Sequence, residues 1–278
     1  MPSAAAPPSF NGNPGSPATQ PWPVTPVQPA AQPDFNQAPS VYARSVLVMD
    51  AVTGRVLFQK NADEQRQVAS TQKLMTALAV MCAGPLSDPV TVAHSDTTVE
   101  PTKIYVQTGE TYERGYLLKA LLVKSGNDIA LSLARDVAGS KEAFSDLMNR
   151  TAFSLGMRHS RFQNPHGLTE PNQFSTARDM AILAREVLKY PYLRQCMQSQ
   201  SMLFTFPDGR TKTLTNTNKV LKRLSYCTGM KTGTTNAAGR CLISSGTLNG
   251  RTVISVVLGS NSANVWDDSE KLLRWALE

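Results

Sequence analysis

Long hydrophobic runs are missing from this 278-residue sequence. No stretch of about 18 consecutive apolar residues occurs, so no segment is expected to cross a membrane as a helix. The first residues also lack a basic segment followed by an apolar one, which is the pattern of a secretory signal. These two absences predict either a cytosolic protein or an exported one whose signal segment has been removed.

Metal-binding and redox motifs are also missing. The chain has four cysteines and three histidines, too few and too scattered for a metal site, and no pair of cysteines has the Cys-x-x-Cys spacing. We therefore expect no metal and no other cofactor, and the sequence leaves open whether any cysteines pair. The residues are Cys82, Cys196, Cys227 and Cys241, and His94, His159 and His166.

Acidic residues are outnumbered, with 21 Asp and Glu against 28 Lys and Arg, for a formal net charge of +7. A basic surface can favour nucleic acid, anionic lipid or another anionic polymer. The Lys and Arg residues do not gather in blocks, however, as they do in most nucleic-acid-binding segments. We therefore expect no nucleic-acid partner, and the charge by itself is consistent with ordinary solubility.

The chain divides by composition near residue 43. Residues 1–43 hold eleven of the eighteen prolines and a single charged residue, Asp34. Such a segment cannot bury an apolar core, so it is predicted to be a disordered, extended linker, either a spacer or a tail without a role. Residues 44–278 are expected to form the folded domain.

The apolar pattern predicts strands at both ends of that domain and helices between them. Short strand-like runs occur at 45–50, 55–60, 203–206, 240–247 and 252–258, and the last two flank Asn249-Gly250, a strong hairpin signal. Helical spacing is found between them, for example at 116–123 and 128–137, and again at 268–277. We predict an α+β fold with one antiparallel sheet flanked by helices. The sheet-bearing part is about 44–95 and 200–278, and the helical subdomain about 96–199.

Three short motifs contain the residue types needed for nucleophilic catalysis. In Ser70-Thr71-Gln72-Lys73 a helix would place Lys73 one turn after Ser70 on the same face. A serine hydroxyl needs a nearby base, and a normal lysine is neutral only about once in 2,500 molecules at pH 7. Burial and a second cation could lower the Lys73 pKa enough for it to serve.

The other two motifs could complete such a site. Ser125-Gly126-Asn127 interrupts two predicted helices, where a hydroxyl could relay a proton and an amide could hold a substrate amide. Lys231-Thr232-Gly233-Thr234 precedes a predicted strand, where Gly lets a peptide approach the backbone closely. Lys231 could be the second cation, and the two threonines could bind a substrate carboxylate.

Together and in this order, the three motifs resemble the signature of class A β-lactamases and penicillin-binding proteins. Gly126 stands where that signature has Asp. This variant is similar to the low-molecular-mass penicillin-binding proteins, the serine-type D-alanyl-D-alanine carboxypeptidase family. The resemblance spans about residues 44–278 and includes the stretches 45–50, 164–168, 175–179 and 229–239.

The resemblance implies a serine β-lactamase/transpeptidase-like fold and a carboxypeptidase that acts on peptidoglycan stem peptides through an acyl-enzyme. It implies peptidoglycan peptides and β-lactam antibiotics as partners, an extracytoplasmic location, and membrane association through a missing signal or anchor segment. The implied catalytic residues are Ser70 as nucleophile, Lys73 as base, and Ser125 and Lys231 as relay and electrostatic partners. The implied substrate-binding residues are Asn127, Thr232, Gly233 and Thr234, and the backbone N–H groups of Ser70 and Thr234 form the oxyanion hole.

Two departures from the family keep alternatives open. Many relatives have an Arg before the last helix that binds the substrate's terminal carboxylate, whereas residues 264–267 here contain none. A D,D-endopeptidase, which would use the same residues, therefore stays as an alternative. The chain also ends at Glu278 without the all-β domain that follows in many relatives, so it is either a short form or a truncated one.

Two further alternatives are weaker. A β-lactamase would need a deacylating Glu, and Glu170 lies in a comparable interval but has its Asn two residues on instead of four. We interpret Glu170 as an exposed loop residue, and His166, in a family-like Asn-Pro-His-Gly turn, as structural. A non-catalytic peptidoglycan-binding module would not need the intact Ser70 and its two lysines.

Overall fold

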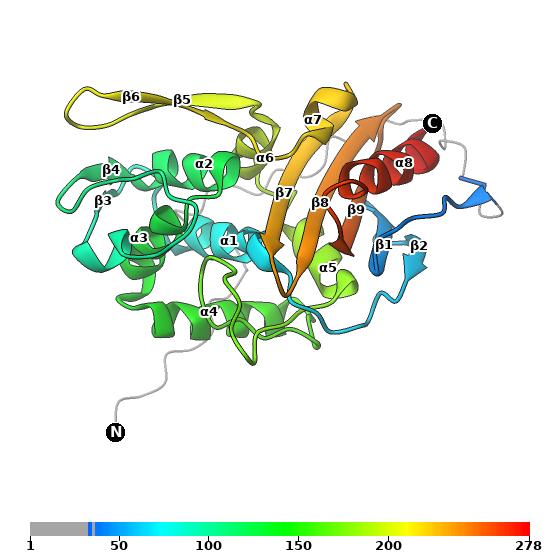
Figure 1. Cartoon of the computed structure of the whole chain (residues 1–278), viewed down its shortest axis with the longest axis horizontal. Coiled ribbons are helices and arrows are strands. Elements are labelled where there is room, and N and C mark those ends of the chain that lie inside the picture. The colour runs from blue at the N-terminus through cyan, green and yellow to red at the C-terminus, as the bar shows by residue number, and fades with distance from the viewer. Residues whose placement is uncertain (1–32, 35–36) are drawn as a thin grey trace.

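The computed structural model describes residues 33–34 and 37–278, and Figure 1 shows how their helices and strands are arranged. Most of the predicted linker, residues 1–43, therefore lies outside the described residues. In the part of the chain that the structure describes, no helix combines the length and apolar character needed to cross a bilayer.

A five-stranded antiparallel sheet is built from both ends of the chain, in the order β2-β1-β9-β8-β7 (Figure 1). β1 pairs with the C-terminal β9, and β2 pairs with β1 at the edge, so the sheet joins the start of the folded domain to its end. The predicted α+β class, with a sheet drawn from both termini, is confirmed. The strands are β1 (Ser45–Asp50), β2 (Val56–Lys60), β7 (Cys227–Thr235), β8 (Gly239–Leu248) and β9 (Arg251–Ser260).

Two hairpins of this sheet follow directly from local sequence. Asn249 and Gly250 join β8 to β9 with φ values of 50° and 75°, the positive values that a two-residue hairpin turn requires. The turn before β2 is fixed by Asp50 Oδ1, which accepts hydrogen bonds from the N–H groups of Val52 (3.1 Å) and Thr53 (2.9 Å). The predicted Asn249-Gly250 hairpin is confirmed.

Helices cover both faces of the sheet. α8 (Val265–Leu277) packs on β8 and β9, while α5 (Ala177–Val187) packs on β1 and β9 from the other side. Alternate residues of β1 therefore belong to different apolar clusters. Val46 lies in the cluster beneath α8, and Leu47 lies in the cluster that continues into the helical region. The strands of the sheet centre are buried on both faces, which explains their nearly unbroken apolar sequence.

The middle of the chain forms a mostly helical region beside the sheet, with α1 at its centre (Figure 1). Nine of the eleven residues of α1 are buried, including Lys73, because α2, α3, α4 and α5 pack around it. A helix buried on all sides is expected to be apolar all round, so the buried lysine is exceptional. The remaining helices are α1 (Lys73–Ala83), α2 (Arg114–Lys124), α3 (Asn127–Ala138), α4 (Lys141–Ser154), α6 (Pro191–Gln198) and α7 (Val220–Arg223), with 3-10 turns at Ala69–Gln72 and His94–Thr97.

Some elements differ from the sequence prediction. The strand expected at 203–206 is the start of a separate hairpin, β5 (Ser201–Thr205) with β6 (Thr211–Thr215), which contacts α2 and does not join the main sheet. Its Phe204 is fully buried, 5.0 Å from the ring of Tyr116 on α2. The sequence did not predict helix α6, which has Pro at its first position. It also did not predict the pairing of two three-residue strands, β3 (Pro89–Thr91) and β4 (Thr111–Glu113). Each of these elements is too short to show a clear hydrophobic period.

A buried carboxylate ties the start of the folded domain to its last helix. The N–H groups of Tyr42 and Ala43 donate to the two oxygens of Asp268, each at 2.9 Å. Ser260 Oγ at the end of β9 donates to the same carboxylate at 3.1 Å. Asp268 therefore joins the start of the folded domain to the end of β9 and to α8.

We expect Asp268→Ala to lower the free energy of unfolding by about 2–4 kcal/mol, because it leaves two N–H groups of the chain start without an acceptor. Urea unfolding followed by circular dichroism would measure the loss. The matched control is Asp267→Ala, which removes an exposed ion pair with Arg223 and should cost less than about 1 kcal/mol. Equal losses in the two variants would contradict the assigned role of Asp268.

Candidate active site

Ser70 lies in the 3-10 turn Ala69–Gln72 that leads into α1. The sequence predicted that a helix opens at Ser70, but α-helical structure begins at Lys73. The Ser70 hydroxyl does not cap this helix and instead donates to the backbone oxygen of His166 at 3.1 Å. Ser70 Oγ is therefore free of the capping role and available for chemistry.

Lys73 is fully buried and its amine meets Ser70. Its Nζ lies 2.8 Å from Ser70 Oγ. The same Nζ donates to Asn127 Oδ1 at 2.7 Å and to the backbone oxygen of His166 at 2.6 Å. The one-turn spacing predicted from the sequence thus produces a direct hydrogen bond, and three oxygens from three segments hold the amine in place.

The electrostatics of the site favour a neutral Lys73. Burial lowers the Lys73 pKa well below its usual value, and the nearby positive charge of Lys231 lowers it further, while Asp128 acts in the opposite direction. Lys231 on β7 is also fully buried, and its Nζ donates to the backbone oxygen of Thr232 at 3.0 Å. Burial lowers the pKa of Lys231 to about 7.

Ser125-Gly126-Asn127 spans the junction between α2 and α3, with Asn127 as the first residue of α3, and faces Ser70 from the helical side. Ser125 has a positive φ of 71° and ends α2. A Cβ atom at Gly126 would lie 2.7 Å from Oδ1 of Asp128, so the buried Asp128 carboxylate explains why Gly replaces Asp in this motif. That carboxylate accepts the N–H groups of Ile104 and Tyr105, which holds the neighbouring loop against the site.

Two glycines allow the backbone to pass close to Ser70. A Cβ atom at Gly233 on β7 would lie 2.7 Å from the backbone nitrogen of Ser70. A Cβ atom at Gly167 would lie 2.2 Å from the backbone oxygen of Ala69, and Gly167 has a φ of 89°. Only glycine fits at either position, so β7 and the Asn-Pro-His-Gly turn press on the Ser70 turn from two sides.

His166 takes part through its backbone. Its carbonyl oxygen accepts from both Ser70 and Lys73, while its ring Nδ1 accepts the N–H of Leu168 at 3.2 Å. Burial and the charge of Lys73 lower the pKa of the ring to about 3, so the imidazole stays neutral. In the described chain, no group of three or more His, Cys, Asp or Glu side chains could hold a metal ion.

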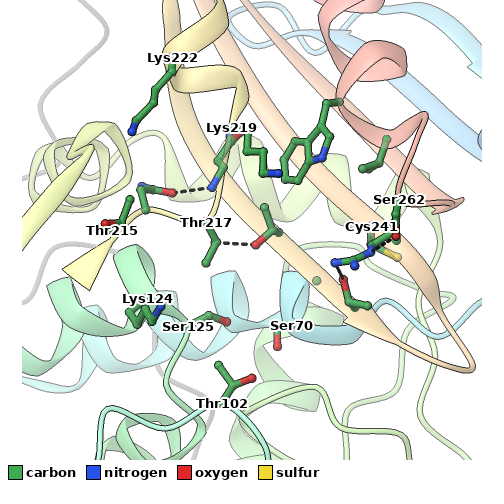
Figure 2. A pocket seen from close by; sticks show the side chains of 18 of the residues that line it. Ser70, Thr102, Lys124, Ser125, Thr215, Thr217, Lys219, Lys222, Cys241 and Ser262 are labelled. Atoms are coloured by element: carbon green, nitrogen blue, oxygen red, sulfur yellow. Dashed lines mark hydrogen bonds between the residues drawn. The ribbon is translucent and has the colours of Figure 1, made fainter. Parts of the chain in front are cut away.

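A cleft of about 870 Å³ opens above Ser70, between the helical region and β7. Figure 2 shows Ser70 and Ser125 at its floor, with Thr215, Thr217, Lys219 and Lys222 on one side and Ser262 on another. Of the predicted site residues, Lys73, Asn127 and Lys231 are buried and do not line the cleft. Those that line it are Ser70, Ser125, Thr232, Gly233 and Thr234.

Comparison with known proteins indicates the same family as the three motifs. The family model described as D-alanyl-D-alanine carboxypeptidase matches residues 32–262. The chain belongs to this family. It is 38% identical over 252 residues to D-alanyl-D-alanine carboxypeptidase DacC of Escherichia coli, covering 86% of this chain and 62% of the relative. It therefore spans less than two thirds of the length of that relative.

Further relatives fit the same family and fold. The D-alanyl-D-alanine endopeptidase of Pseudomonas aeruginosa is 36% identical over 238 residues, covering 83% of this chain and 76% of the relative. The crystal structure of the D-alanyl-D-alanine carboxypeptidase DacD from Francisella tularensis superposes with a TM-score of 0.81 at 28% identity, covering 91% of this chain and 73% of that one. The predicted family and fold are confirmed.

Among the cleft residues that the sequence did not indicate in this carboxypeptidase-family protein, Arg240 bears most directly on substrate binding. Residues 264–267 lack an arginine, but Arg240 on β8 lines the cleft instead. Its Nη1 donates to Thr234 Oγ1 and its Nε to Ser262 Oγ, both at 3.0 Å. Arg240 lies several residues after the Lys-Thr-Gly segment in sequence, and only the antiparallel pairing of Arg240 with Thr234 shows that the two meet.

Two further sequence predictions concern Glu170 and the cysteines. Glu170 is half-buried, not exposed, and it does not line the cleft. Its backbone oxygen accepts from Gln67 at 2.8 Å, which gives the residue a structural contact in its loop. The four cysteines, whose pairing was left open, are all free.

We expect Lys231→Met to stabilise the protein at pH 6 by about 1 kcal/mol or more, because it removes a buried charge. The folded pKa of about 7 lies below the unfolded value of about 10.4. Between these values the unfolded chain binds a proton that the folded one lacks, so the parent gains stability as pH rises. The advantage of Lys231→Met should therefore shrink toward pH 9.

Urea unfolding at pH 6, 7.5 and 9 would measure this difference. Lys271→Met, which alters an exposed lysine on α8, is the control and should change little at any pH. A Lys231→Met protein that is less stable than the parent at pH 6 would contradict the expected cost of burying this charge.

Proposed function

We propose that this protein is a serine-type D-Ala-D-Ala carboxypeptidase that acts on peptidoglycan stem peptides through an acyl-enzyme and is acylated by β-lactams. The observation that carries the proposal is the fully buried Lys73 amine, 2.8 Å from Ser70 Oγ. Lys231 lies close enough to depress its pKa. A binding module would not need an amine held in this costly environment.

In the proposed reaction, Ser70 Oγ attacks the carbonyl carbon of the penultimate D-Ala and gives its proton to Lys73 Nζ. The backbone N–H groups of Ser70 and Thr234 stabilise the oxyanion. The tetrahedral intermediate collapses, the C–N bond breaks, and the departing amine of D-Ala takes a proton relayed through Ser125. Water then hydrolyses the ester on Ser70 and regenerates the enzyme.

Asn127 has a positioning role in this scheme. Its side chain is almost fully buried, and both ends are occupied: Oδ1 accepts from Lys73 and Nδ2 donates to the backbone oxygen of Pro101 at 2.5 Å. The sequence suggested that it holds a substrate amide. We propose instead that it orients the Lys73 amine, while Thr232, Gly233 and Thr234, which line the cleft, contact the substrate.

Arg240 favours carboxypeptidase over endopeptidase activity. Its guanidinium is half-buried and hydrogen-bonds two hydroxyls, but no described carboxylate forms an ion pair with it. A free terminal carboxylate could bind Arg240 and Thr234 together through charge-assisted hydrogen bonds. An endopeptidase substrate has a peptide continuing beyond this position, which would leave the guanidinium without a matching charge.

The setting of this activity is also part of the proposal. Peptidoglycan lies outside the cytoplasmic membrane, so we propose that the protein acts there, with 44–278 as the catalytic domain and the proline-rich segment before it as a linker from a signal or membrane anchor. The boundary falls slightly earlier than the predicted residue 44, because Tyr42 and Ala43 are hydrogen-bonded to Asp268. Glu170 does not line the cleft, which supports slow deacylation and argues against a β-lactamase.

Incubation with purified muropeptides tests the proposed function. We expect pentapeptide stems to lose one terminal D-Ala, detected by mass spectrometry, and Arg240→Gln to reduce kcat/KM for that loss by about tenfold, the scale of one charge-assisted hydrogen bond. The control is the parent on a pentapeptide with an amidated C-terminus, which should react poorly. Splitting of cross-linked dimers without release of D-Ala would favour an endopeptidase.

The two active-site lysines should respond differently to replacement by arginine, which keeps the charge but does not deprotonate in proteins. Lys73→Arg should lower the second-order rate of acylation by labelled penicillin at least about a hundredfold, since it removes the general base. Lys231→Arg should lower it distinctly less. The label should map to the Ser70 peptide and persist for minutes.

Circular dichroism would confirm that both variants are folded. A folded Lys73→Arg protein that reacts as fast as the parent would overturn the role of Lys73. Rapid turnover of penicillin without a trapped adduct would indicate a β-lactamase.

A further inference from the structure

The charged residues that line the cleft around Ser70 are all cationic. None of its lining residues is Asp or Glu, although the described chain has many carboxylates elsewhere. A cleft lined by one sign of charge focuses its field and attracts ligands of the opposite sign. The cationic residues that line it are Lys124, Lys219, Lys222, Arg223 and Arg240.

Three of these cations have no carboxylate partner in the described chain. Arg223 pairs with Asp267 at 2.6 Å and with Glu270 at 3.3 Å, and Arg240 is held by two hydroxyls. The lysines that do form ion pairs among the described residues are Lys103, Lys141 and Lys189, none of which lines the cleft. The charges of Lys124, Lys219 and Lys222 are thus left for a ligand.

Lys219 and Lys222, which we call the lysine ledge, lie at one end of the cleft. They belong to α7 and the residue before it, in the segment between β6 and β7. In Figure 2 they lie on the far side of Thr217 from Ser70, away from Ser262. Both side chains are exposed, and Lys219 Nζ lies 5.5 Å from the ring centre of Trp266.

The backbone beneath the ledge is fixed. Asn218 is buried, and its side chain accepts the N–H of Val220 at 3.0 Å and donates to the backbone oxygen of Gly229 on β7 at 3.2 Å. Thr217 Oγ1 is 2.6 Å from Thr232 Oγ1, also on β7. The ledge is therefore attached to the strand that borders Ser70, and only the two lysine side chains are left to adjust to a ligand.

The cleft has cationic groups at two ends, Arg240 and the lysine ledge, which fits a substrate that carries two anionic groups. We propose that the lysine ledge is a subsite for a carboxylate carried by the acyl part of the substrate, the part that stays on Ser70 after D-Ala leaves. This inference rests on the proposed function, which places the terminal carboxylate at Arg240. With that end fixed, the acyl part extends from Ser70 away from Arg240, along the polar wall of Thr215 and Thr217.

The test compares two substrates that differ only in the charge of the acyl end. One is a tripeptide ending in D-Ala-D-Ala with a succinyl cap, which carries a carboxylate, and the other has a neutral acetyl cap. At low salt we expect the parent enzyme to prefer the succinyl peptide in kcat/KM by about threefold to tenfold, the range for two exposed ion pairs. The preference should fall as salt rises toward about 0.5 M.

The double variant Lys219→Gln/Lys222→Gln should bring the ratio of the two kcat/KM values to about one. The control is Lys271→Gln, which removes a positive charge from the exposed face of α8 and should keep the parent's preference. Using the ratio separates the subsite from any general loss of activity, since such a loss lowers both values together.

Three results would overturn the inference. A parent enzyme that reacts normally with penicillin but shows no preference for the succinyl peptide would reject the subsite and leave the proposed function standing. A preference that survives in the double variant would place the recognition elsewhere. If neither peptide releases D-Ala and penicillin does not label Ser70, the proposed function and the subsite fail together.

Discussion

The contact on which the rest of this site depends is the hydrogen bond between the Lys73 amine and the Ser70 hydroxyl inside the protein. An ammonium is unfavourable in a buried position, so burial favours the neutral amine that can accept a proton. Lys231 is buried nearby and works in the same direction. Two buried lysines lower the stability of the domain, and the extensive apolar packing of α1 and the sheet must offset that cost.

The fold delivers this contact by bringing four separate segments to one point. α1 supplies Lys73, the start of α3 supplies Asn127, the turn at His166 supplies a carbonyl oxygen, and β7 borders the other side. Gly167 and Gly233 let the last two approach the Ser70 backbone more closely than any side chain would permit. The absence of side chains at Gly167 and Gly233 is therefore as important for forming the site as the reactive groups themselves.

The surface above Ser70 adds recognition to this reactive centre. Its basic lining matches a substrate with carboxylates, with Arg240 at one end and the lysine ledge at the other. Arg240 lies on β8 beside Thr234, so the cleft has a guanidinium although residues 264–267 contain none. Relatives of similar identity bear the names of carboxypeptidases and of an endopeptidase.

The sequence by itself determined what depends on neighbouring residues. The one-turn spacing of Ser70 and Lys73, the Asn249-Gly250 hairpin, the helices around Ser125-Gly126-Asn127 and the α+β class all follow from local periodicity and turn chemistry, and the three motifs in order indicated the family. Only the tertiary structure decided the burial of Lys73 and Lys231, the inward orientation of Asn127, the role of the His166 carbonyl and the position of Arg240. Burial and long-range contacts depend on how segments that are distant in sequence pack together. A local sequence pattern does not indicate which side chains this packing excludes from water.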